Sequence, residues 1–388
     1  MVLLKKKQIV NFIFVLLIFN SIWSIFYTKD AWAGYNVELQ NGWQYQLSKI
    51  IYAGVILLMT PVLFNHKRYF ENTKLLSCVI VLHVLLALFL GQTVELGEVS
   101  KLFLLCLSFP FFAYALNSKF DNTLLKILII AIALNIVSSI LQANTLLSSI
   151  RDDSFRTGQG SAVTIIYLFP IFFYVFKDKL SSYFYIIGAV LVFISLRRTA
   201  IIAYFLCLPF IFARIKKNVS LIVFISSLVI FVTLVLYIVS NYWNVLQMRF
   251  GDMFVADVNG SYGSGRSDWF ALLFDNYVKR PEYWVQGAGP NVVGDILHKA
   301  GYPFRVAHSD ILELLLGYGL LGLSLWFYTF YKIIVVTRKR WVSSDNRKLV
   351  YMSVVSYLFI STVSGCVFNP NFIVIPIFYG LIINKKRI

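Results

Sequence analysis

Long apolar runs recur from one end of this chain to the other, and short polar segments separate them. A helix that crosses a bilayer needs roughly 17–25 predominantly apolar residues. Twelve runs approach that length, so the pattern predicts an all-α, polytopic membrane protein with about twelve transmembrane helices. The predicted spans are 9–27, 47–64, 75–91, 99–116, 124–142, 161–176, 180–196, 200–213, 219–240, 311–334, 349–366 and 367–383.

The composition agrees with a membrane fold. Of the 388 residues, 59% are hydrophobic and 14% are charged, whereas about 25% of the residues in a soluble domain are charged. A soluble enzyme and a disordered tail are therefore excluded, and residues 1–388 are predicted to form a single polytopic membrane domain. The net charge of +17 does not indicate nucleic-acid binding, because the basic residues lie in short clusters between apolar runs.

The polar segments fall into two sets of different charge, which alternate along the predicted topology. Segments on the side of the N-terminus, with their flanking turns, carry 22 Lys and Arg residues and four acidic residues. Segments on the other side carry 13 basic and 14 acidic residues. Basic loops are retained in the cytoplasm, so both termini are predicted to be cytoplasmic.

One outward segment, 241–310, is far longer than the others. Within it, Ser267–Val278 has the apolar spacing of an amphipathic helix that could lie on the bilayer surface. A second helix is predicted over Asn291–Ala300, with Gly301 in the left-handed position at its end. The Gly287–Pro290 segment between them is interpreted as a tight turn and not as a dinucleotide fingerprint, because no strand precedes it.

Arg266 and Trp269 lie where this loop passes from glycine-rich sequence into the first predicted helix. Exposed backbone N–H groups and a guanidinium at such a position can bind an anion. The alternative for Arg266 is a surface cation bound to lipid headgroups. Trp269 can stack on a sugar ring or belong to an interfacial belt of aromatic residues.

His308 immediately precedes the tenth predicted span, near Asp310 and Glu313. The spacing of the two acids resembles a capping box, with Asp310 as the N-cap. A neutral imidazole just outside a helix N-terminus can accept a proton from a hydroxyl group, while the helix end favours a nearby anion. A histidine without a catalytic role at the membrane surface is the alternative.

Arg197 and Arg198 occupy the tip of a short outward hairpin between two predicted spans. At about 1.5 Å per residue, both legs are shorter than a hydrocarbon core about 30 Å thick. The two guanidinium groups are therefore expected slightly below the membrane surface, where they are costly unless they face water or an anion. A phosphate-binding role is favoured, and the alternative is a thinned bilayer with snorkelling side chains.

The residue pattern predicts neither a metal site nor a transporter. The four cysteines lie in apolar runs without paired spacing, and the four histidines form no zinc-binding motif. Ion-coupled transporters usually carry charged groups at the bilayer midplane. The main ionisable residue away from the ends of the predicted spans is His83, which we interpret as a hydrogen-bonded packing residue.

The order of these features resembles the O-antigen polymerase and O-antigen ligase superfamily of bacterial inner-membrane glycosyltransferases. The resemblance covers most of the chain and rests on many spans together with four local motifs. These are Ser195-Leu196-Arg197-Arg198-Thr199-Ala200 at the hairpin, Arg266 followed by Trp269, the Gly287-Ala288-Gly289 turn, and His308-Ser309-Asp310-Ile311-Leu312-Glu313 leading to Gly317-Tyr318-Gly319-Leu320-Leu321-Gly322.

The resemblance implies transfer of glycans from undecaprenyl diphosphate on the periplasmic face, without a metal or other cofactor. It implies that Arg266 and Arg198 bind the diphosphate, or Arg197 in place of Arg198, since the doubled arginine obscures the alignment. His308 would activate the acceptor hydroxyl. Supporting roles are expected for Asp310, Glu313 and Trp269. The implied partners are the lipid-linked oligosaccharide, membrane lipids and a chain-length regulator protein, with no nucleic acid.

Members of the superfamily differ in their acceptor. The compact chain and the His-Ser-Asp motif look more like a polymerase, which joins repeat units into O-antigen or capsular polysaccharide. A ligase would instead transfer the glycan to the lipopolysaccharide core. A lipid-linked oligosaccharide flippase is an alternative from another class, but it would need a charged cavity within the membrane.

Overall fold

The computed structural model describes residues 2–31, 43–64, 71–89, 94, 96–116, 122–143, 162–176, 178–195, 197–215, 233, 240, 266–302, 307, 309–339, 342–364 and 370–384. Every secondary-structure element within these residues is a helix, and they contain no strand. The prediction of an all-α fold is therefore confirmed for the described part of the chain.

Eleven of the twelve predicted spans coincide with described helices, and the remaining span, 219–240, lies almost entirely outside the described residues. These helices are α1 (Val2–Ala31), α3 (Trp43–Phe64), α4 (Glu71–Phe89), α5 (Leu96–Ala115), α6 (Asn122–Ala143), α8 (Ala162–Val175), α9 (Asp178–Ile194), α10 (Arg198–Ile215), α16 (Asp310–Thr337), α17 (Ser344–Val363) and α18 (Val374–Asn384), the last preceded by the 3₁₀ turn η1 (Pro370–Ile373). Three shorter helices lie in the segment predicted as the large loop: α13 (Arg266–Lys279), α14 (Tyr283–Gln286) and α15 (Val292–Lys299).

Several described helices indicate a membrane-embedded protein. Four stretches are long and apolar enough to cross a bilayer by length and composition: Gln8–Ile25, Asn72–Phe89, Thr123–Ile140 and Asp310–Thr337. Six more described helices contain shorter apolar stretches of 10–17 residues. Helix α17 belongs to neither group; its first turns carry Asp345, Arg347 and Lys348.

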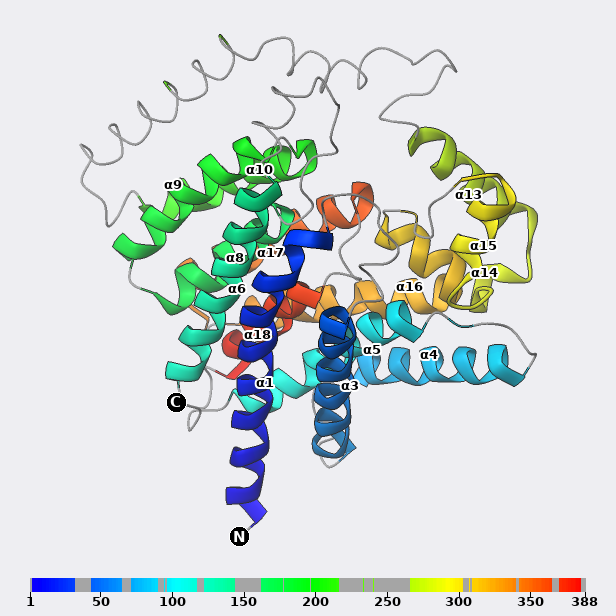
Figure 1. The fold of residues 1–388 in the computed structure, drawn as a ribbon, viewed down its shortest axis with the longest axis horizontal. Coiled ribbons are helices and arrows are strands. Elements are labelled where there is room, and N and C mark those ends of the chain that lie inside the picture. Colours follow the sequence, from blue (N-terminus) through cyan, green and yellow to red (C-terminus); the bar gives the residue numbers. More distant parts are fainter. Residues whose placement is uncertain are drawn as a thin grey trace.

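The described helices do not form one parallel bundle. Figure 1 shows α1 and α3 side by side along the vertical direction, whereas α4 and α16 run across the view. Helix α4 lies antiparallel to α16: the Asn72 amide donates to the Leu325 carbonyl at 3.0 Å and to Thr329 Oγ1 at 2.5 Å. Nearer the beginning of α16, the His83 ring lies edge-on to Tyr318 with centroids 5.5 Å apart.

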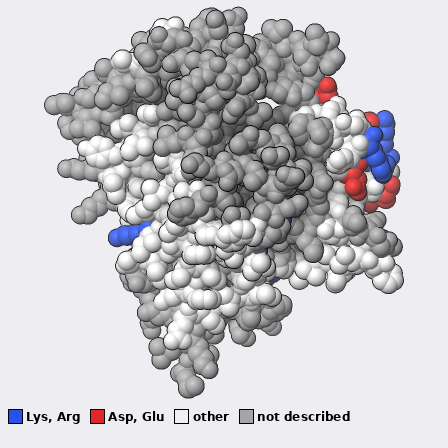
Figure 2. All heavy atoms as spheres, in the orientation of Figure 1, with Lys and Arg blue, Asp and Glu red and all other residues white. Residues whose placement is uncertain are grey.

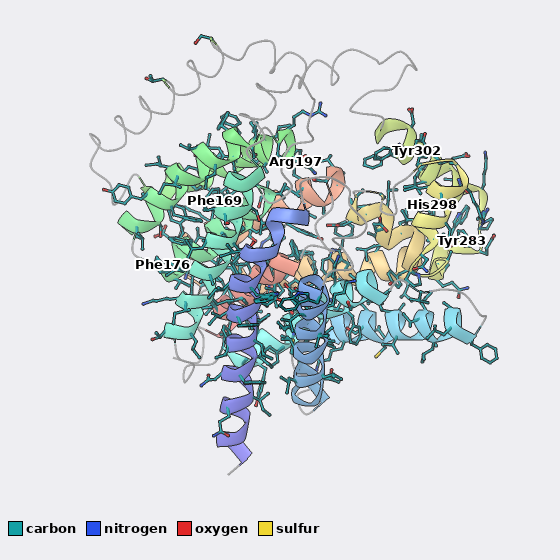
Figure 3. All side chains as sticks on the ribbon, viewed as in Figure 1. Phe169, Phe176, Arg197, Tyr283, His298 and Tyr302 are labelled. Carbon is teal, nitrogen blue, oxygen red and sulfur yellow. The ribbon has the colours of Figure 1, made fainter. Side chains whose placement is uncertain are left out.

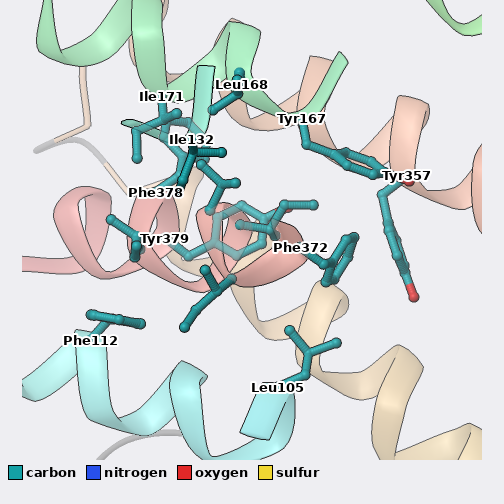
Figure 4. Close-up of a cluster of buried hydrophobic side chains, with 14 of the residues drawn as sticks. Leu105, Phe112, Ile132, Tyr167, Leu168, Ile171, Tyr357, Phe372, Phe378 and Tyr379 are labelled. Atoms are coloured by element: carbon teal, nitrogen blue, oxygen red, sulfur yellow. The ribbon is translucent and has the colours of Figure 1, made fainter. Parts of the chain in front are cut away.

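Aromatic side chains fill the centre of the core and fix the position of α17. The Tyr357 ring stacks on Phe330 at 4.6 Å and lies 4.9 Å from Phe372. Figure 4 shows Tyr167, Phe372 and Tyr357 together at one side of the buried cluster. Aromatic pairs contribute about 0.5–1.5 kcal/mol beyond the burial of their area. This packing holds α17 between α8, α10 and α16.

Candidate functional site

Arg197 lies at the turn between α9 and α10, where its guanidinium contacts the C-terminal end of α17. Its Nη2 donates to Ser364 Oγ at 2.8 Å, and its backbone N–H donates to Ser195 Oγ at 3.2 Å. A cation at this position also interacts favourably with the negative end of the helix dipole. Arg198 is the first residue of α10, and both arginine side chains are half-buried.

Tyr357 connects the same face of α17 to the beginning of α16. It lies seven residues before Ser364, so the two side chains are about two turns, or roughly 10 Å, apart on one side of the helix. The Tyr357 hydroxyl accepts from Trp326 Nε1 at 2.7 Å and donates to Asp310 Oδ2 at 3.5 Å. One face of α17 therefore links the arginine hairpin to Asp310.

The cap of α16 differs from the predicted capping box. Ser309, not Asp310, is the N-cap, with extended φ and ψ of −145° and 114° and a side chain that accepts from the Leu312 N–H at 3.5 Å. A Glu313 carboxylate oxygen accepts from the Ala307 N–H, outside the cap. Because the serine hydroxyl caps the helix one residue earlier, both carboxylates lie buried in the first turn, where the helix dipole favours negative charge.

The predicted glycine turn binds directly to the backbone of α16. The Ala288 N–H donates to the Leu316 carbonyl at 2.8 Å, and the Gly289 N–H donates to the Gly317 carbonyl at 2.9 Å. A regular helix would bond these carbonyls to N–H groups four residues later. Two of the motifs on which the resemblance rests therefore contact each other.

Gly319 makes this contact possible by interrupting α16. Its φ of 66° and ψ of −168° are non-helical. A Cβ on Gly319 would collide with the Val285 carbonyl, and a Cβ on Gly287, where φ is 76°, would collide with the backbone of Gly317 and Tyr318. Glycine is required at both positions because the two backbones approach closely and because positive φ is costly for other residues.

His83 of α4 completes the junction. Its Nε2 lies 2.8 Å from the Gln286 carbonyl oxygen, and its Nδ1 lies 2.8 Å from the Val79 carbonyl oxygen. The interpretation of His83 as a hydrogen-bonded packing residue is confirmed. The side chain ties α4 to α14, immediately before the glycine turn.

The helices of the large loop match the prediction closely. Helix α13 includes the predicted Ser267–Val278, and α15 lies within Asn291–Ala300 and is followed by Gly301 with φ of 84°. The apolar face of α13 that was predicted to meet lipid, however, packs against protein. Trp269, Leu273 and Tyr277 are buried in a small core with residues of α15 and α16, because α13, α15 and the beginning of α16 bury their apolar faces against one another.

Trp269 is part of this small core. It is 8% exposed, and its ring lies edge-on to Tyr302 with centroids 5.8 Å apart. Helix α13, which begins at Arg266, packs against both α15 and α16. The backbone of Arg266 is described, whereas its side chain and the whole of His308 lie outside the described residues.

The structure brings together some of the predicted site residues. Arg197 and Asp310 are linked through α17, and Glu313 holds the backbone at Ala307, next to the position of His308. Figure 3 shows Arg197 and Tyr302 both in the upper half of the view, on separate groups of helices.

The sequence alone did not identify Ser364, Tyr357 and Trp326 as functional residues. Their side chains connect the arginine hairpin, α17 and α16. They lie inside apolar runs that were interpreted only as membrane spans. The spacing of seven residues between Tyr357 and Ser364 was the available signal, since it places two polar groups on one face of a helix.

A scan of the chain against protein-family models finds no match, and a search of the curated proteins finds none either. The geometry of the site and the sequence motifs are therefore the basis for a functional assignment.

Proposed function

We propose that this chain is a glycosyltransferase of the bacterial inner membrane that polymerises oligosaccharide repeat units carried on undecaprenyl diphosphate. The strongest support for this proposal is the face of α17 that contacts both the arginine hairpin and the start of α16. There Ser364 holds Arg197 and Tyr357 contacts Asp310. Transfer from a lipid diphosphate requires cations for the leaving group close to a base for the acceptor hydroxyl.

In the proposed reaction, an acceptor hydroxyl oxygen attacks the anomeric carbon of the donor. The bond from that carbon to the diphosphate oxygen breaks, its electron pair leaves with the diphosphate, and His308 takes the hydroxyl proton. Arg266 and one or both of Arg197 and Arg198 neutralise the charge that grows on the diphosphate, in place of a metal ion. Attack opposite the leaving group inverts the configuration at the anomeric carbon.

The proposed topology puts this chemistry on the periplasmic face. Segment 241–310 is periplasmic and both termini are cytoplasmic, as the charge difference between the two sets of polar segments favours. The donor then arrives from within the membrane, and a chain-length regulator is a candidate protein partner.

The test uses purified protein and a synthetic undecaprenyl diphosphate repeat unit, with donor binding and product formation measured separately. His308→Ala should retain donor binding but form product about 10²–10⁴-fold more slowly, as expected for loss of a general base. Chelator should have no effect. Polymer formation by His308→Ala within a few-fold of the natural protein would exclude His308 as the base.

The same assay examines the arginines. Arg198→Ala and Arg266→Ala should weaken donor binding, and lysine should restore it only in part, because a planar guanidinium binds two phosphate oxygens at once. Arg280→Ala is the matched control, since Arg280 is an exposed arginine of the same loop that donates to the Tyr283 hydroxyl at 2.7 Å. Product formed only on lipopolysaccharide core would identify a ligase, and donor translocation without a new glycosidic bond would identify a flippase.

A further inference from the structure

Helix α13 has an exposed apolar strip in addition to its buried face. Phe274 and Val278 are one turn apart, and they are 55% and 47% exposed. At 100° per residue they lie beside the buried Leu273 and Tyr277, so the strip borders the small core of the loop helices. Contact of such an apolar strip with water is unfavourable.

Helix α14 extends this strip and is firmly attached to α13. Trp284 is 44% exposed and Val285 is 67% exposed. The Tyr277 hydroxyl donates to the Trp284 carbonyl at 3.0 Å, and Trp284 Nε1 donates to the Tyr277 carbonyl at 2.9 Å. A tyrosine hydroxyl is neutral at physiological pH and able to donate, and burial raises the pKa of Tyr277 further. We call Phe274, Val278, Trp284 and Val285 the apolar edge.

The apolar edge continues into the exposed surface of α4, one of the helices long and apolar enough to span a membrane. The carbonyl oxygen of Gln286, which follows Val285, lies 2.8 Å from Nε2 of His83 in α4. One side of α4 near that contact is apolar and about half or more exposed. It consists of Leu82, Leu85, Leu86 and Phe89.

Charged side chains occupy the other side of the loop helices. On α13, Asp268, Asp275 and Lys279 lie away from the buried face, and Lys279 Nζ is 2.6 Å from Asp275 Oδ2. Figure 2 shows Lys, Arg, Asp and Glu side chains gathered at the right of the view, over the region of α13–α15 in Figure 1. Below them, toward α4, the described surface is uncharged.

We propose that the apolar edge is inserted into the interfacial layer of the lipid bilayer, beside the lipid-facing surface of α4. Lipid is the occupant that fits, because the edge is continuous with an exposed apolar helix face and contains a tryptophan, a residue enriched at membrane interfaces. The charged side of the loop helices then faces water. Insertion fixes the height of the loop helices, and with them the start of α16, at the membrane surface.

Nitroxide labels, each on one introduced cysteine of the full-length protein in lipid nanodiscs, test this placement. Cys78, which is exposed, and Cys366 are replaced by serine, and the buried Cys106 and Cys207 are retained. Val278→Cys and Val285→Cys report on the apolar edge. Lys279→Cys is the matched control, since it adjoins position 278 on the charged side, and Asp295→Cys is a second control on α15. Power saturation compares collisions with oxygen, which concentrates in lipid, and with a water-soluble nickel chelate.

Insertion requires a higher ratio of oxygen to nickel collisions at both 278 and 285 than at either control. If all four labels are equally accessible to nickel, the edge is in water and the proposal is wrong. It is equally wrong if labels at 278 and 285 are shielded from both reagents, because another protein surface then covers the edge. The measurement does not involve glycosyl transfer, so its outcome is independent of the proposed enzymatic function.

Discussion

At the scale of single residues, the Tyr357 hydroxyl joins two helices that the site requires to be close. Tyr357 is fully buried, and its oxygen accepts from Trp326 Nε1 while its proton points to Asp310. A buried polar group that loses its partner costs about 1–3 kcal/mol. This hydroxyl therefore contributes to stability as well as to the position of Asp310.

Tyr357→Phe should lower the free energy of unfolding by about 1–3 kcal/mol, because it keeps the ring contacts but removes the hydroxyl that Trp326 and Asp310 share. Unfolding of the purified protein in detergent measures the change. Tyr331→Phe is the control: its side chain is 60% exposed, and surface substitutions usually change stability by less than about 0.5 kcal/mol. Equal losses in the two variants would contradict a structural role for this hydroxyl.

At the scale of helices and turns, the apolar runs were sufficient to predict where helices form, but not how helices contact one another. The ends of α13 and α15 followed from local signals, because amphipathic spacing and a left-handed glycine depend on nearby residues. The kink at Gly319 and its contact with the glycine turn depend on residues about thirty positions apart. The burial of the α13 apolar face was missed for the same reason, since a periodic pattern does not specify whether lipid or protein covers it.

Gly319→Ala tests the contact between the turn and α16. The positive φ alone should cost about 1–3 kcal/mol, and collision of the new Cβ with the Val285 carbonyl should add to this loss. Gly301 has a φ of 84°, but a Cβ there would meet no group of the described residues within 4 Å, so Gly301→Ala should lose only the backbone contribution. Gly54→Ala, in open space within α3, should be neutral or stabilising. Unfolding free energies in any other order would contradict the assigned close contact.

At the scale of the whole molecule, the candidate site depends on packing that no single motif contains. The arginine hairpin and the start of α16 are more than a hundred residues apart in sequence, and α17 joins them through Ser364 and Tyr357. Sequence motifs identified both ends of this connection because arginine pairs and helix starts have local signatures. The connection itself could not be predicted, because it arises from the aromatic packing around α17.

Charge gives the clearest expectation for the orientation of the whole chain. The segments assigned to the cytoplasm carry 22 basic and four acidic residues, and those assigned to the periplasm carry 13 and 14. Such a bias sets orientation because clustered Lys and Arg near span ends are translocated poorly.

In a Cys78→Ser and Cys366→Ser background, a membrane-impermeant maleimide added to intact spheroplasts should label Ser261→Cys in the large loop. It should label Ser344→Cys, which is exposed at the start of α17, only after lysis. Labelling of Ser344→Cys in intact spheroplasts would place the basic segments outside, and the arginine hairpin with the start of α16 would then face the cytoplasm, away from a periplasmic donor.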